Sequence, residues 1–356
     1  MKIITVVGAR PQLVKAAAVS RELRKVYKEV LIHTGQHYDD SMSDVFFREL
    51  NIPEPDYNLG IGSGSHGAQT GAMLSALEPV LLREKPDCVL VYGDTNSTLA
   101  GALAATKLHI PIAHVEAGLR SFNRKMPEEV NRVIVDHISD LLLCPCRGAK
   151  ANLTKEGIVN GVHVVGDVMF DALLFSAEKS SRSSRILKCL DLKPGKFILV
   201  TLHRAENTDI RGRLESVMLA LNKLAADEPV IFPVHPRTKN KIDAMGFRFE
   251  AKNMRLIPPV GPLDMVMLER SARVILTDSG GIQKEAYWLK VPCVTLRDET
   301  EWGETISTGW NVLASANTEN IVRHSRAARH PKSSPKLYGN GMAARKITEK
   351  LSAVLR

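Results

Sequence analysis

Three acidic residues stand at places along the chain where their carboxylates could take part in proton transfer. Glu116 directly follows the apolar run at residues 112–115, a position where no helix cap or surface role accounts for it. Asp94 could instead cap the helix expected at residues 95–108, and Glu128 could be an ordinary first-turn acid. Three carboxylates that converge at one edge of a sheet suit proton transfer or the stabilisation of a cationic transition state.

Two basic residues lie at the first expected strand-to-helix turn, in the segment GARPQLVK at residues 8–15. Pro11 can occupy the first turn of a helix, which places Arg10 at the helix start and Lys15 little more than one turn later. Both side chains could then reach a phosphate at the end of the strand. The same pattern also fits two solvated cations, and this segment alone does not decide between them.

A Gly-Gly pair follows an apolar run in the segment TDSGGIQKEA at residues 277–286. Gly280 and Gly281 would expose backbone N–H groups at a helix start, where the helix dipole favours an anion. Ser279 adds a hydroxyl donor, and Glu285, one turn into the helix, could accept hydrogen bonds from a ribose diol. The alternative is a Gly-Gly turn with an ordinary N-cap, and we favour the phosphate site.

Histidine and arginine residues follow other apolar runs of the second half. His203 comes after residues 197–202 and is a candidate acid or base because histidine titrates near neutral pH, although a structural histidine is the alternative. His235 follows the next apolar run in a similar position. Arg297 could neutralise a phosphate or hold Glu285 in place.

Two further patterns match known motifs but lack the context that these motifs need. Residues 62–67 read G-x-G-x-x-G, yet they follow PDYNL at residues 55–59 and no buried strand. We therefore expect a loop that caps the next helix and no dinucleotide site. Cys144 and Cys146 lack a second Cys or His pair at ligand spacing, so we expect no metal site there.

Short apolar runs alternate with helical periods along nearly the whole chain, and several runs are apolar throughout, as in strands covered on both faces. Strands are expected at residues 3–7, 30–34, 88–92, 112–115, 141–144, 163–165, 197–202, 230–234, 254–257, 274–277, 293–296 and 311–313. Helical periods include residues 12–25, 67–83, 95–108 and 281–289. This order predicts an α/β protein with doubly wound parallel sheets.

A domain boundary is expected within residues 171–196. The polar run EKSSRSSR at residues 178–185 and the turn KPGK at residues 193–196 precede a new buried strand. Each half then holds about six strands, which is the size of one doubly wound domain. A second polar stretch, at residues 330–335, precedes a last helix at residues 342–355.

The composition narrows the class of protein and of partner. The chain has 356 residues, of which 44% are apolar and 24% charged, so it is globular and neither disordered nor fibrous. Its net charge of +9 suits an anionic partner, and because basic residues are dispersed and only 5% of residues are aromatic, we expect a small phosphorylated molecule and no nucleic acid. We expect no membrane span and no signal peptide, and five cysteines mostly in apolar runs indicate reduced thiols in the cytoplasm.

These segments belong to a larger set that occurs in a fixed order: GARPQxxK, HTGQHYD, GDTNSTLAGALAA, HVEAGLRSF, MPEEVNR, LHRAEN, HPRT and DSGGIQKEA. The set resembles the non-hydrolysing UDP-N-acetylglucosamine 2-epimerase family over nearly the full chain. The resemblance implies a glycosyltransferase-B fold, with Rossmann-like domains at residues 1–172 and 173–340, the active site between them, and a last helix at residues 341–356 packed on the first domain. It also implies a homodimer that acts on a UDP-sugar and needs neither a metal ion nor NAD.

The resemblance assigns roles by position within these segments. The residues that match the family's catalytic positions are Lys15, Asp94, Glu116, Glu128 and His203. Arg10, Lys15 and His203 are also expected to bind the substrate. The residues that match its UDP site are Ser279, Gly280, Gly281 and Glu285, with Arg297 nearby. Gln36, Arg204 and His235 lie in segments that resemble the region where some bacterial members bind a second UDP-N-acetylglucosamine as an allosteric activator.

The sequence departs from the commonest family pattern at two places. Gln12 stands where many members have glutamate, and Glu-Trp-Gly-Glu at residues 301–304 replaces Glu-Arg-Pro-Glu. These variants resemble a subgroup that includes UDP-2,3-diacetamido-2,3-dideoxyglucuronate 2-epimerases. We expect UDP-N-acetylglucosamine as the substrate, with that glucuronate as the second candidate. A glycosyltransferase of the same fold, a hydrolysing epimerase and a sugar-nucleotide sensor are the competing functions.

The chemistry of C2 inversion explains why the implied site needs both acids and cations. The C2 hydrogen of the sugar is not next to a carbonyl group, so its direct removal would be slow. The family is known to eliminate UDP from C1, which acidifies C2–H, to form a glycal, and to add UDP back. Carboxylates would shuttle the proton, while Arg10, Lys15 and the helix start at Gly280 would stabilise the departing anion.

Overall fold

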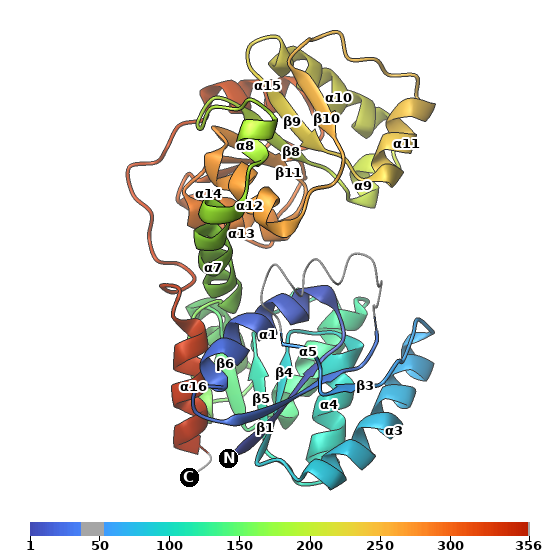
Figure 1. The fold of residues 1–356 in the computed structure, drawn as a ribbon, viewed down its shortest axis with the longest axis vertical. Coiled ribbons are helices and arrows are strands. Elements are labelled where there is room, and N and C mark those ends of the chain that lie inside the picture. The colour runs from blue at the N-terminus through green and yellow to red at the C-terminus, as the bar shows by residue number, and fades with distance from the viewer. Residues whose placement is uncertain (37–52, 355–356) are drawn as a thin grey trace. The chain divides into compact units, whose positions relative to one another are not determined.

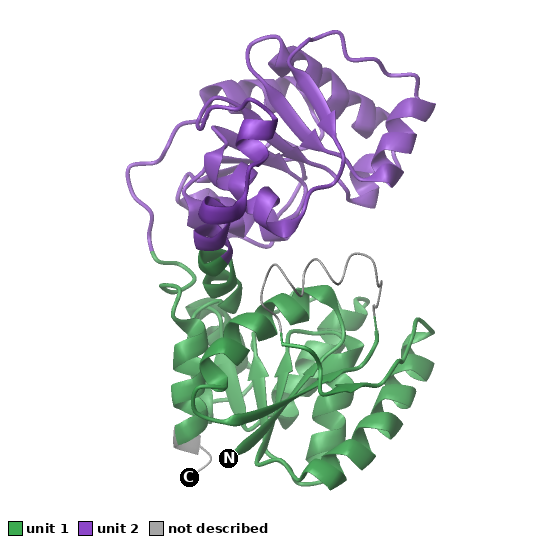
Figure 2. Ribbon diagram, viewed as in Figure 1, with its two compact units in different colours: residues 1–175, 336–356 green, residues 176–335 purple. Residues whose placement is uncertain are grey.

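The computed structural model describes residues 1–36 and 53–354 and divides the chain into two compact units (Figure 2). Unit 1 comprises Met1–Phe175 with Lys336–Arg356, and unit 2 comprises Ser176–Pro335. The last residues of the HTGQHYD segment, 37–39, lie outside the described residues. In the described part of the chain, we find no helix with the length and apolar character that a membrane crossing requires.

Unit 1 is built on a seven-stranded parallel sheet in the order β3-β2-β1-β4-β5-β6-β7 (Figure 1). Its strands are β1 (Lys2–Val7), β2 (Lys28–His33), β3 (Tyr57–Asn58), β4 (Cys88–Tyr92), β5 (Ile112–Val115), β6 (Leu141–Cys144) and β7 (Val162–Val164). The sequence analysis did not predict β3, because its two residues are half-buried or exposed and form no apolar run. The other strands were predicted to within two residues at each end.

Helices cover both faces of this sheet (Figure 1). One face carries α1 (Arg10–Leu23) and α16 (Ala343–Val354), which also contact each other. The other face carries α3 (His66–Glu84), α4 (Asn96–Lys107) and α5 (Pro127–Ile138). Two more helices are α6 (Arg147–Lys155) and α7 (Val168–Ser183).

The polar part of the expected boundary segment is largely helical. The polar run at residues 178–185 was interpreted as part of a domain boundary, and α7 continues through it to Ser183. Its charged residues and serines lie mainly on the exposed side of that helix, so their polarity reflects solvent exposure and no break in secondary structure. The chain passes from unit 1 to unit 2 inside α7, after Phe175.

The C-terminal residues complete the core of unit 1. Asp171 in α7 accepts hydrogen bonds from the backbone N–H groups of Ala343 (3.1 Å) and Ala344 (2.9 Å), at the start of α16. Ile347 and Leu351 of α16 are fully buried in the same cluster as α1 and β1. A side chain of one helix therefore caps another helix that is distant in sequence.

Unit 2 is built on a six-stranded parallel sheet in the order β10-β9-β8-β11-β12-β13. Its strands are β8 (Ile198–Thr201), β9 (Val230–Pro233), β10 (Met254–Ile257), β11 (Val274–Thr277), β12 (Cys293–Thr295) and β13 (Asn311–Leu313). Its helices are α8 (Ile186–Cys189), α9 (Ala205–Thr208), α10 (Arg211–Ala225), α11 (Pro236–Ala244), α12 (Pro262–Ser271), α13 (Gly280–Leu289), α14 (Gly303–Ser307) and α15 (Thr318–Ala327). The α10 and α15 helices cover one face of the sheet, and α12 and α13 cover the other.

The two sheets share one topological feature that positions the candidate site. The order of strands reverses beside the first strand of each unit, between β1 and β4 in unit 1 and between β8 and β11 in unit 2. Ligands of doubly wound sheets bind at such a reversal, beyond the carboxyl ends of the strands. The predicted phosphate-binding segments follow β1 and β11, and Asp94 follows β4, while Glu116 follows β5, the neighbour of β4. This arrangement confirms the doubly wound α/β fold class.

Candidate active-site residues

A buried glutamine shapes the turn after β1. The Gln12 Oε1 atom accepts hydrogen bonds from the backbone N–H groups of Gly8 (2.8 Å) and Ala9 (3.1 Å). Its Nε2 atom donates to the Tyr92 carbonyl (2.8 Å) and to Thr98 Oγ1 (2.9 Å). The amide therefore joins the turn after β1 to the turn after β4, on either side of the strand reversal. An ionised glutamate has no N–H donor and could not make the second pair of bonds.

The turns after β1 and β5 bring a lysine and a glutamate together. Lys15 Nζ forms an ion pair with Glu116 Oε2, and each side chain is only 12% exposed. Burial by itself would lower the pKa of Lys15, but the charge of Glu116, with contributions from Asp94 and Asp167, raises that pKa above its ordinary value. Lys15 is thus a buried cation next to two of the acids singled out in the sequence.

The backbone around this ion pair is in an uncommon conformation. Glu116 has a φ of 73°, in the left-handed region that few residues other than glycine adopt. Gly93 has a φ of 63°, and a Cβ atom there would lie 3.3 Å from Glu116 Oε2 and 3.4 Å from Lys15 Nζ. Strained backbone next to a buried ion pair is typical of functional sites, since the surrounding structure has to maintain it.

An arginine of α5 holds the second acid. Arg132 donates from Nε (3.0 Å) and Nη2 (2.6 Å) to Asp94 Oδ2, while Asn131 Nδ2 donates to the Asp94 carbonyl (2.8 Å). The expectation that Asp94 could cap a helix is wrong, because Thr95 occupies the N-cap of α4 and its side chain accepts from the Thr98 N–H group. The sequence analysis quoted MPEEVNR but did not single out Arg132. Its spacing from two glutamates on one helix was the available signal.

The two neighbouring glutamates of α5 have different environments. Glu129 is buried and accepts from the Ser121 and Phe122 N–H groups, each at 2.9 Å. Burial would raise its pKa, but these hydrogen bonds and that from Arg132 lower the pKa below its ordinary value. Glu128 is exposed and has no hydrogen-bond or ion-pair partner among the residues that the structure describes. Of the three acids expected to converge, only Glu116 and Asp94 act on a common group, Lys15.

A buried histidine supports the turn after β4. The His114 Nε2 atom lies 2.7 Å from the Gly93 carbonyl, and its Nδ1 atom lies 2.7 Å from Asp136 Oδ1. Because a carbonyl only accepts, Nε2 donates there. Asp136 also accepts from the Gly118 N–H group (3.1 Å) and from Arg120 Nη1 (2.6 Å). This network fixes the backbone on both sides of the Lys15–Glu116 pair, but it does not include the pair itself.

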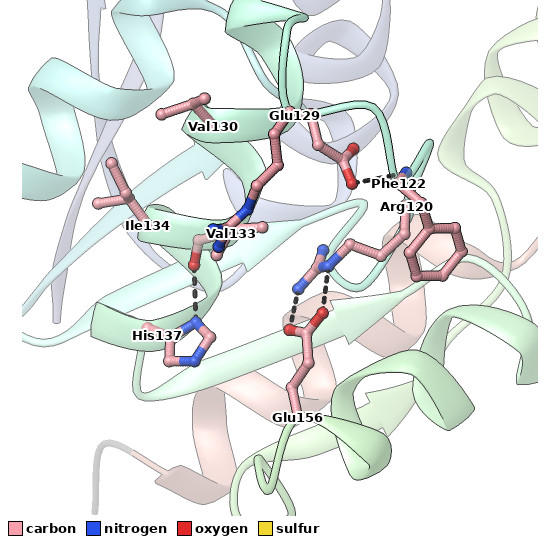
Figure 3. Close-up of a pocket in the computed structure, with 9 residues that line it drawn as sticks. Arg120, Phe122, Glu129, Val130, Val133, Ile134, His137 and Glu156 are labelled. Atoms are coloured by element: carbon pink, nitrogen blue, oxygen red, sulfur yellow. Dashed lines mark hydrogen bonds and ion pairs between the residues drawn. The ribbon is translucent and has the colours of Figure 1, made fainter.

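A surface pocket of about 730 Å³ lies beside α5 in unit 1 (Figure 3). Its lining residues are Arg120, Phe122, Arg124, Glu129, Val130, Val133, Ile134, His137 and Glu156. The Arg120 guanidinium forms two hydrogen bonds with Glu156, at 2.8 and 2.6 Å, along one side of it. None of the residues predicted to be catalytic lines this pocket, so it is distinct from the site around Lys15, Glu116 and Asp94.

In unit 2, a buried aspartate presents the candidate histidine. Asp278, directly after β11, accepts hydrogen bonds from the backbone N–H groups of His203 (3.1 Å) and Arg204 (2.9 Å) and from Asn207 Nδ2 (3.3 Å). The His203 Nδ1 atom is 3.4 Å from Asp278 Oδ1, and its side chain is 55% exposed. Asp278 thus orients an exposed imidazole at the strand reversal. The position of Asp278 in the TDSGG segment did not predict this role.

The predicted anion site lies at the start of α13. Ser279 is the N-cap, and its hydroxyl accepts from the Ile282 N–H group at 3.5 Å. The cap does not conflict with an anion site, because the first N–H groups of the helix remain available. The N–H groups of Gly280 and Gly281 lie in the first helical turn, where intrahelical acceptors are lacking. A Cβ atom on Gly280 would lie 3.2 Å from Trp302 Nε1, so glycine allows the Trp302 ring to approach this helix start closely.

Glu285 and Arg297 have other partners than each other. Arg297 is buried and forms two hydrogen bonds with Glu301, at 2.8 and 3.0 Å, and its Nε atom is 3.6 Å from Glu206. These contacts with Glu301 raise the pKa of Arg297. Glu285 forms a side-chain hydrogen bond with Glu269 of α12. The expectation that Arg297 holds Glu285 therefore has no support, since Glu301 and Glu206 engage its guanidinium.

The residues proposed for an allosteric site have local roles in the fold. Gln36 Oε1 accepts from the Ser97 N–H group (3.2 Å) and hydroxyl (2.7 Å) in unit 1. In unit 2, His235 is the N-cap of α11 and accepts from the Arg237 N–H group (3.2 Å). The Arg204 guanidinium lies 4.0 Å from a Glu301 oxygen. Arg10, a predicted substrate ligand, is the first residue of α1.

The two weak motifs have structural roles. Burial raises the pKa of the Cys144 thiol to about 12, and Cys146 is the residue before α6. Over residues 1–36 and 53–354, no group of three or more His, Cys, Asp or Glu side chains is arranged to hold a metal ion. In the Gly-rich segment at residues 62–67, the Gly62 carbonyl accepts from Gln69 Nε2 (2.9 Å), which joins this loop to α3. The loop supplies the N-cap residue of α3, Ser65, but the Ser65 side chain makes no capping hydrogen bond.

Comparisons with known proteins show which family and which solved structures this chain resembles. The model of the family described as UDP-N-acetylglucosamine 2-epimerase matches residues 21–352. A UDP-N-acetylglucosamine 2-epimerase homologue of Methanococcus maripaludis is 55% identical over 99% of both chains, and the UDP-2,3-diacetamido-2,3-dideoxy-D-glucuronate 2-epimerase of Pseudomonas aeruginosa is 49% identical over 99% of both. The crystal structure of Methanocaldococcus jannaschii UDP-GlcNAc 2-epimerase in complex with UDP-GlcNAc and UDP has a TM-score of 0.84 and 44% identity, and covers 99% of this chain and 100% of that one.

Proposed function

This chain belongs to the UDP-N-acetylglucosamine 2-epimerase family, and from this premise we propose that it inverts C2 of UDP-N-acetylglucosamine to give UDP-N-acetylmannosamine without net hydrolysis. The observation that carries the proposal is the largely buried Lys15 cation, which is paired with Glu116 and attracted by the charge of Asp94, at the carboxyl ends of strands around the reversal of unit 1. An elimination that expels an anion and removes a proton needs a cation and carboxylates at one place.

Departure of UDP from C1 is the first step of the proposed reaction. The leaving group is an anion, so backbone N–H groups and cations that meet it lower the barrier. In unit 2 the start of α13, at Gly280 and Gly281, supports a diphosphate by this chemistry. In unit 1 Lys15 and Arg10 lie in the first helix after β1, and we assign them to anion binding. Glu285 is assigned to the ribose hydroxyls.

Proton transfer at C2 is the second step. A carboxylate is the form of Glu116 that pairs with the Lys15 ammonium, and a carboxylate can accept the C2 proton. Asp94 is held by Arg132, and Glu128 is exposed, which leaves it able to turn toward a substrate. Inversion requires proton transfer on both faces of C2. We propose that Glu116, Asp94 and Glu128 share this work, with His203 as an additional acid or base.

We propose that the two units divide these tasks. Residues 1–172, with the C-terminal segment that contains α16, form the domain that supplies the proton-transfer groups. Residues 173–340 form the domain that binds UDP. Lys15 and Asp94 follow the strands at the reversal of unit 1, and His203 and the Gly280–Gly281 pair follow those at the reversal of unit 2, which supports this division.

The relative from Pseudomonas aeruginosa supports a second candidate substrate. It is named for UDP-2,3-diacetamido-2,3-dideoxy-D-glucuronate and is 49% identical to this chain. Incubation of the protein with each UDP-sugar alone, without an acceptor, separates the candidates. We expect UDP-N-acetylglucosamine to yield its C2 epimer. Conversion of the glucuronate only would assign the second substrate, and free UDP in step with free sugar would indicate a hydrolysing enzyme. Consumption of neither sugar would favour a glycosyltransferase or a sensor and would contradict the proposal.

We also propose that the protein is a homodimer that pairs through the surface around α5. Four large apolar side chains are exposed in this region: Phe122 (75%), Met126 (36%), Val130 (42%) and Ile134 (36%). Exposed apolar residues that gather on one helix mark an interaction surface more often than residues that are exposed singly. The pocket beside α5 offers a place for an apolar side chain of a second copy (Figure 3).

Two further proposals concern regulation and location. We propose that a second UDP-N-acetylglucosamine activates the enzyme through Gln36, Arg204 and His235. Under this proposal, UDP-N-acetylmannosamine alone is converted only after a lag, which a trace of UDP-N-acetylglucosamine removes. We also propose a cytoplasmic location, because Cys88, Cys144 and Cys293 are buried free thiols.

A further inference from the structure

Unit 2 contains a buried glutamate that the proposed mechanism does not use. Glu269 of α12 is only 1% exposed, and its Oε2 atom is buried without a hydrogen-bond partner among the described residues. It adjoins an apolar cluster that includes Leu268 and Ala286. The presence of a carboxyl group in such surroundings calls for a functional explanation, because a buried polar atom without a partner destabilises the fold by about 1–3 kcal/mol.

The group that contacts the Glu269 carboxyl is another acid. The Glu269 side chain forms a hydrogen bond with Glu285 of α13, whose side chain is half-buried and partly open to solvent. Two carboxylates can only accept hydrogen bonds, so a hydrogen bond between these groups requires that one of them carries a proton. Burial, and then the charge of Glu285, raise the pKa of Glu269 well above its ordinary value. Glu269, the more buried of the two, is therefore the one that holds the proton.

Among the described groups that act on Glu269, none is a cation that would favour its ionised form. Glu285, from α13, is the titratable group that affects it. The α8 helix also packs against α12 and contributes Ile186 and Leu187 to the apolar cluster there, while α7 contacts α12 through Arg270, which donates to the Ala177 carbonyl (2.8 Å). In these surroundings a neutral carboxylic acid is the stable form of Glu269, as in pairs of carboxyl groups that share one proton.

We propose that Glu269 is a positioning residue whose carboxylic acid donates a hydrogen bond to Glu285 and fixes that carboxylate for a ribose diol. The inference rests on the proposed function, which assigns Glu285 to the ribose of UDP. A glutamate side chain has three rotatable bonds, and an internal hydrogen bond fixes one oxygen before the ligand arrives. The remaining acceptor positions then meet both ribose hydroxyls at a smaller entropic cost.

This role predicts an opposition between stability and binding. Replacing Glu269 by leucine removes a buried carboxyl group with an unpartnered oxygen, so the variant should melt at the same temperature or higher. The same replacement removes the hydrogen bond from Glu269 to Glu285, so the affinity for UDP should fall. A merely structural role for Glu269 would move both quantities in the same direction, because the variant would unfold more easily.

The experiment compares Glu269→Gln and Glu269→Leu in the full chain by calorimetric titration with UDP and by thermal unfolding. A glutamine amide donates to a carboxylate, so Glu269→Gln should bind UDP within about twofold of the wild type. Glu269→Leu should bind roughly tenfold more weakly, the lower end of what a hydrogen bond to a charged group contributes. Equal binding by Glu269→Leu and the wild type would overturn the proposal, as would an equal loss in both variants.

A double-mutant cycle with Glu285→Gln separates this inference from the proposed function. If Glu269 acts only through Glu285, then adding Glu269→Leu to Glu285→Gln should cause no further loss of UDP affinity. A full additive loss would overturn the positioning role. Unchanged UDP binding by Glu285→Gln, or no binding of UDP by the wild type, would contradict the proposed function itself.

An infrared spectrum of the unliganded protein tests the proton directly. The wild type at neutral pH should show a carboxylic-acid C=O band that shifts in D₂O and is missing from Glu269→Gln. If the two spectra are identical in this region, Glu269 carries no proton and the inference fails.

Discussion

Arg132 donates two hydrogen bonds to the same carboxylate oxygen of Asp94, from Nε at 3.0 Å and from Nη2 at 2.6 Å. Its third nitrogen, Nη1, donates to Glu129 at 2.7 Å. Glu129 in turn accepts from two backbone N–H groups of the turn at residues 121–122. One guanidinium therefore joins a proposed catalytic acid to a buried carboxylate that holds the backbone. The Asp94 side chain is therefore held by α5, while its backbone belongs to the turn after β4.

Arg132→Lys tests this positioning. Lysine keeps the positive charge but cannot bind Asp94 and Glu129 at once through a planar group. We expect kcat to fall about 100-fold, since small displacements of a catalytic group have effects of that size. The matched control is Arg124→Lys, an exposed arginine of the preceding loop, which should leave kcat unchanged. A kcat for Arg132→Lys within twofold of the wild type would show that Asp94 does not need this arginine.

The Lys15–Glu116 ion pair predicts a pH dependence of stability. The pKa of Lys15 in the folded protein is raised above its ordinary value of 10.5, so the pair's contribution is complete below that value and is lost as the pH rises through the folded pKa. Lys15→Met should lower the free energy of unfolding by about 3 kcal/mol, because it leaves Glu116 partly buried without its cation.

Urea titrations at a series of pH values measure this difference. The gap between the wild type and Lys15→Met should be constant from pH 7 to about pH 10 and should narrow above that. Lys125→Met, at an exposed lysine, serves as the control. A gap that stays the same at strongly alkaline pH would mean that the charge of Lys15 does not stabilise the fold.

Gly93 and Gly60 form a matched pair for testing the space around the ion pair. Both have a positive φ, 63° and 62°, but a Cβ atom on Gly60 would meet nothing within 4 Å, whereas one on Gly93 would crowd Glu116 and Lys15. Alanine should destabilise both sites by about 1 kcal/mol through backbone strain. Only Gly93→Ala should also lower kcat, by about tenfold or more, because it displaces the Lys15–Glu116 pair. Equal activities of the two variants would contradict the role of the pair.

Asp171 is expected to hold the C-terminal helix in unit 1. Asp171→Ala removes both hydrogen bonds to the start of α16 and should lower stability by about 1 kcal/mol, the usual effect of losing a helix cap. Amide hydrogen exchange in α16 should accelerate, while exchange in α10 of unit 2 should stay as in the wild type. Asp171→Asn keeps an oxygen acceptor, so its stability should lie between those of the wild type and Asp171→Ala. Unchanged exchange in α16 would show that the cap is dispensable.

The proposed dimer surface predicts an effect of charge on α5. Ile134→Lys places a cation in the exposed apolar group, so it should convert a dimer into a monomer in size-exclusion chromatography with light scattering. Leu82→Lys, at an exposed leucine of α3, is the control and should remain dimeric. A monomeric wild type, or a dimeric Ile134→Lys, would contradict the proposed interface.

The sequence predicted most strands of the fold because their apolar residues are consecutive in the chain. The strands at residues 88–92, 112–115 and 141–144 are buried throughout and were placed without error. By contrast, β3 at Tyr57–Asn58 is short and partly exposed, so it has no pattern of its own. The polar end of α7 was not predicted to be helical, because an exposed helix face and a loop have similar compositions.

The candidate site was predictable only where a residue's position in the chain implies its place. Glu116 follows a strand directly, and a residue there must lie at the carboxyl edge of the sheet. Arg132 and Glu269 act through side chains that are distant in sequence, Asp94 and Glu285. Nothing in the spacing of Glu269 indicates that it faces another acid, because this depends on how α12 packs against α13.

The central claim is that the enzyme inverts C2 through loss of the C2 proton. Proton NMR of the purified protein with UDP-N-acetylglucosamine in D₂O, without added metal ion or nicotinamide, tests it most directly. We predict the appearance of UDP-N-acetylmannosamine with deuterium at C2 in both epimers. Inversion with the original hydrogen retained at C2 would contradict the proton-transfer mechanism. An unchanged spectrum with this sugar, and also with the diacetamido-glucuronate nucleotide, would contradict the epimerase assignment.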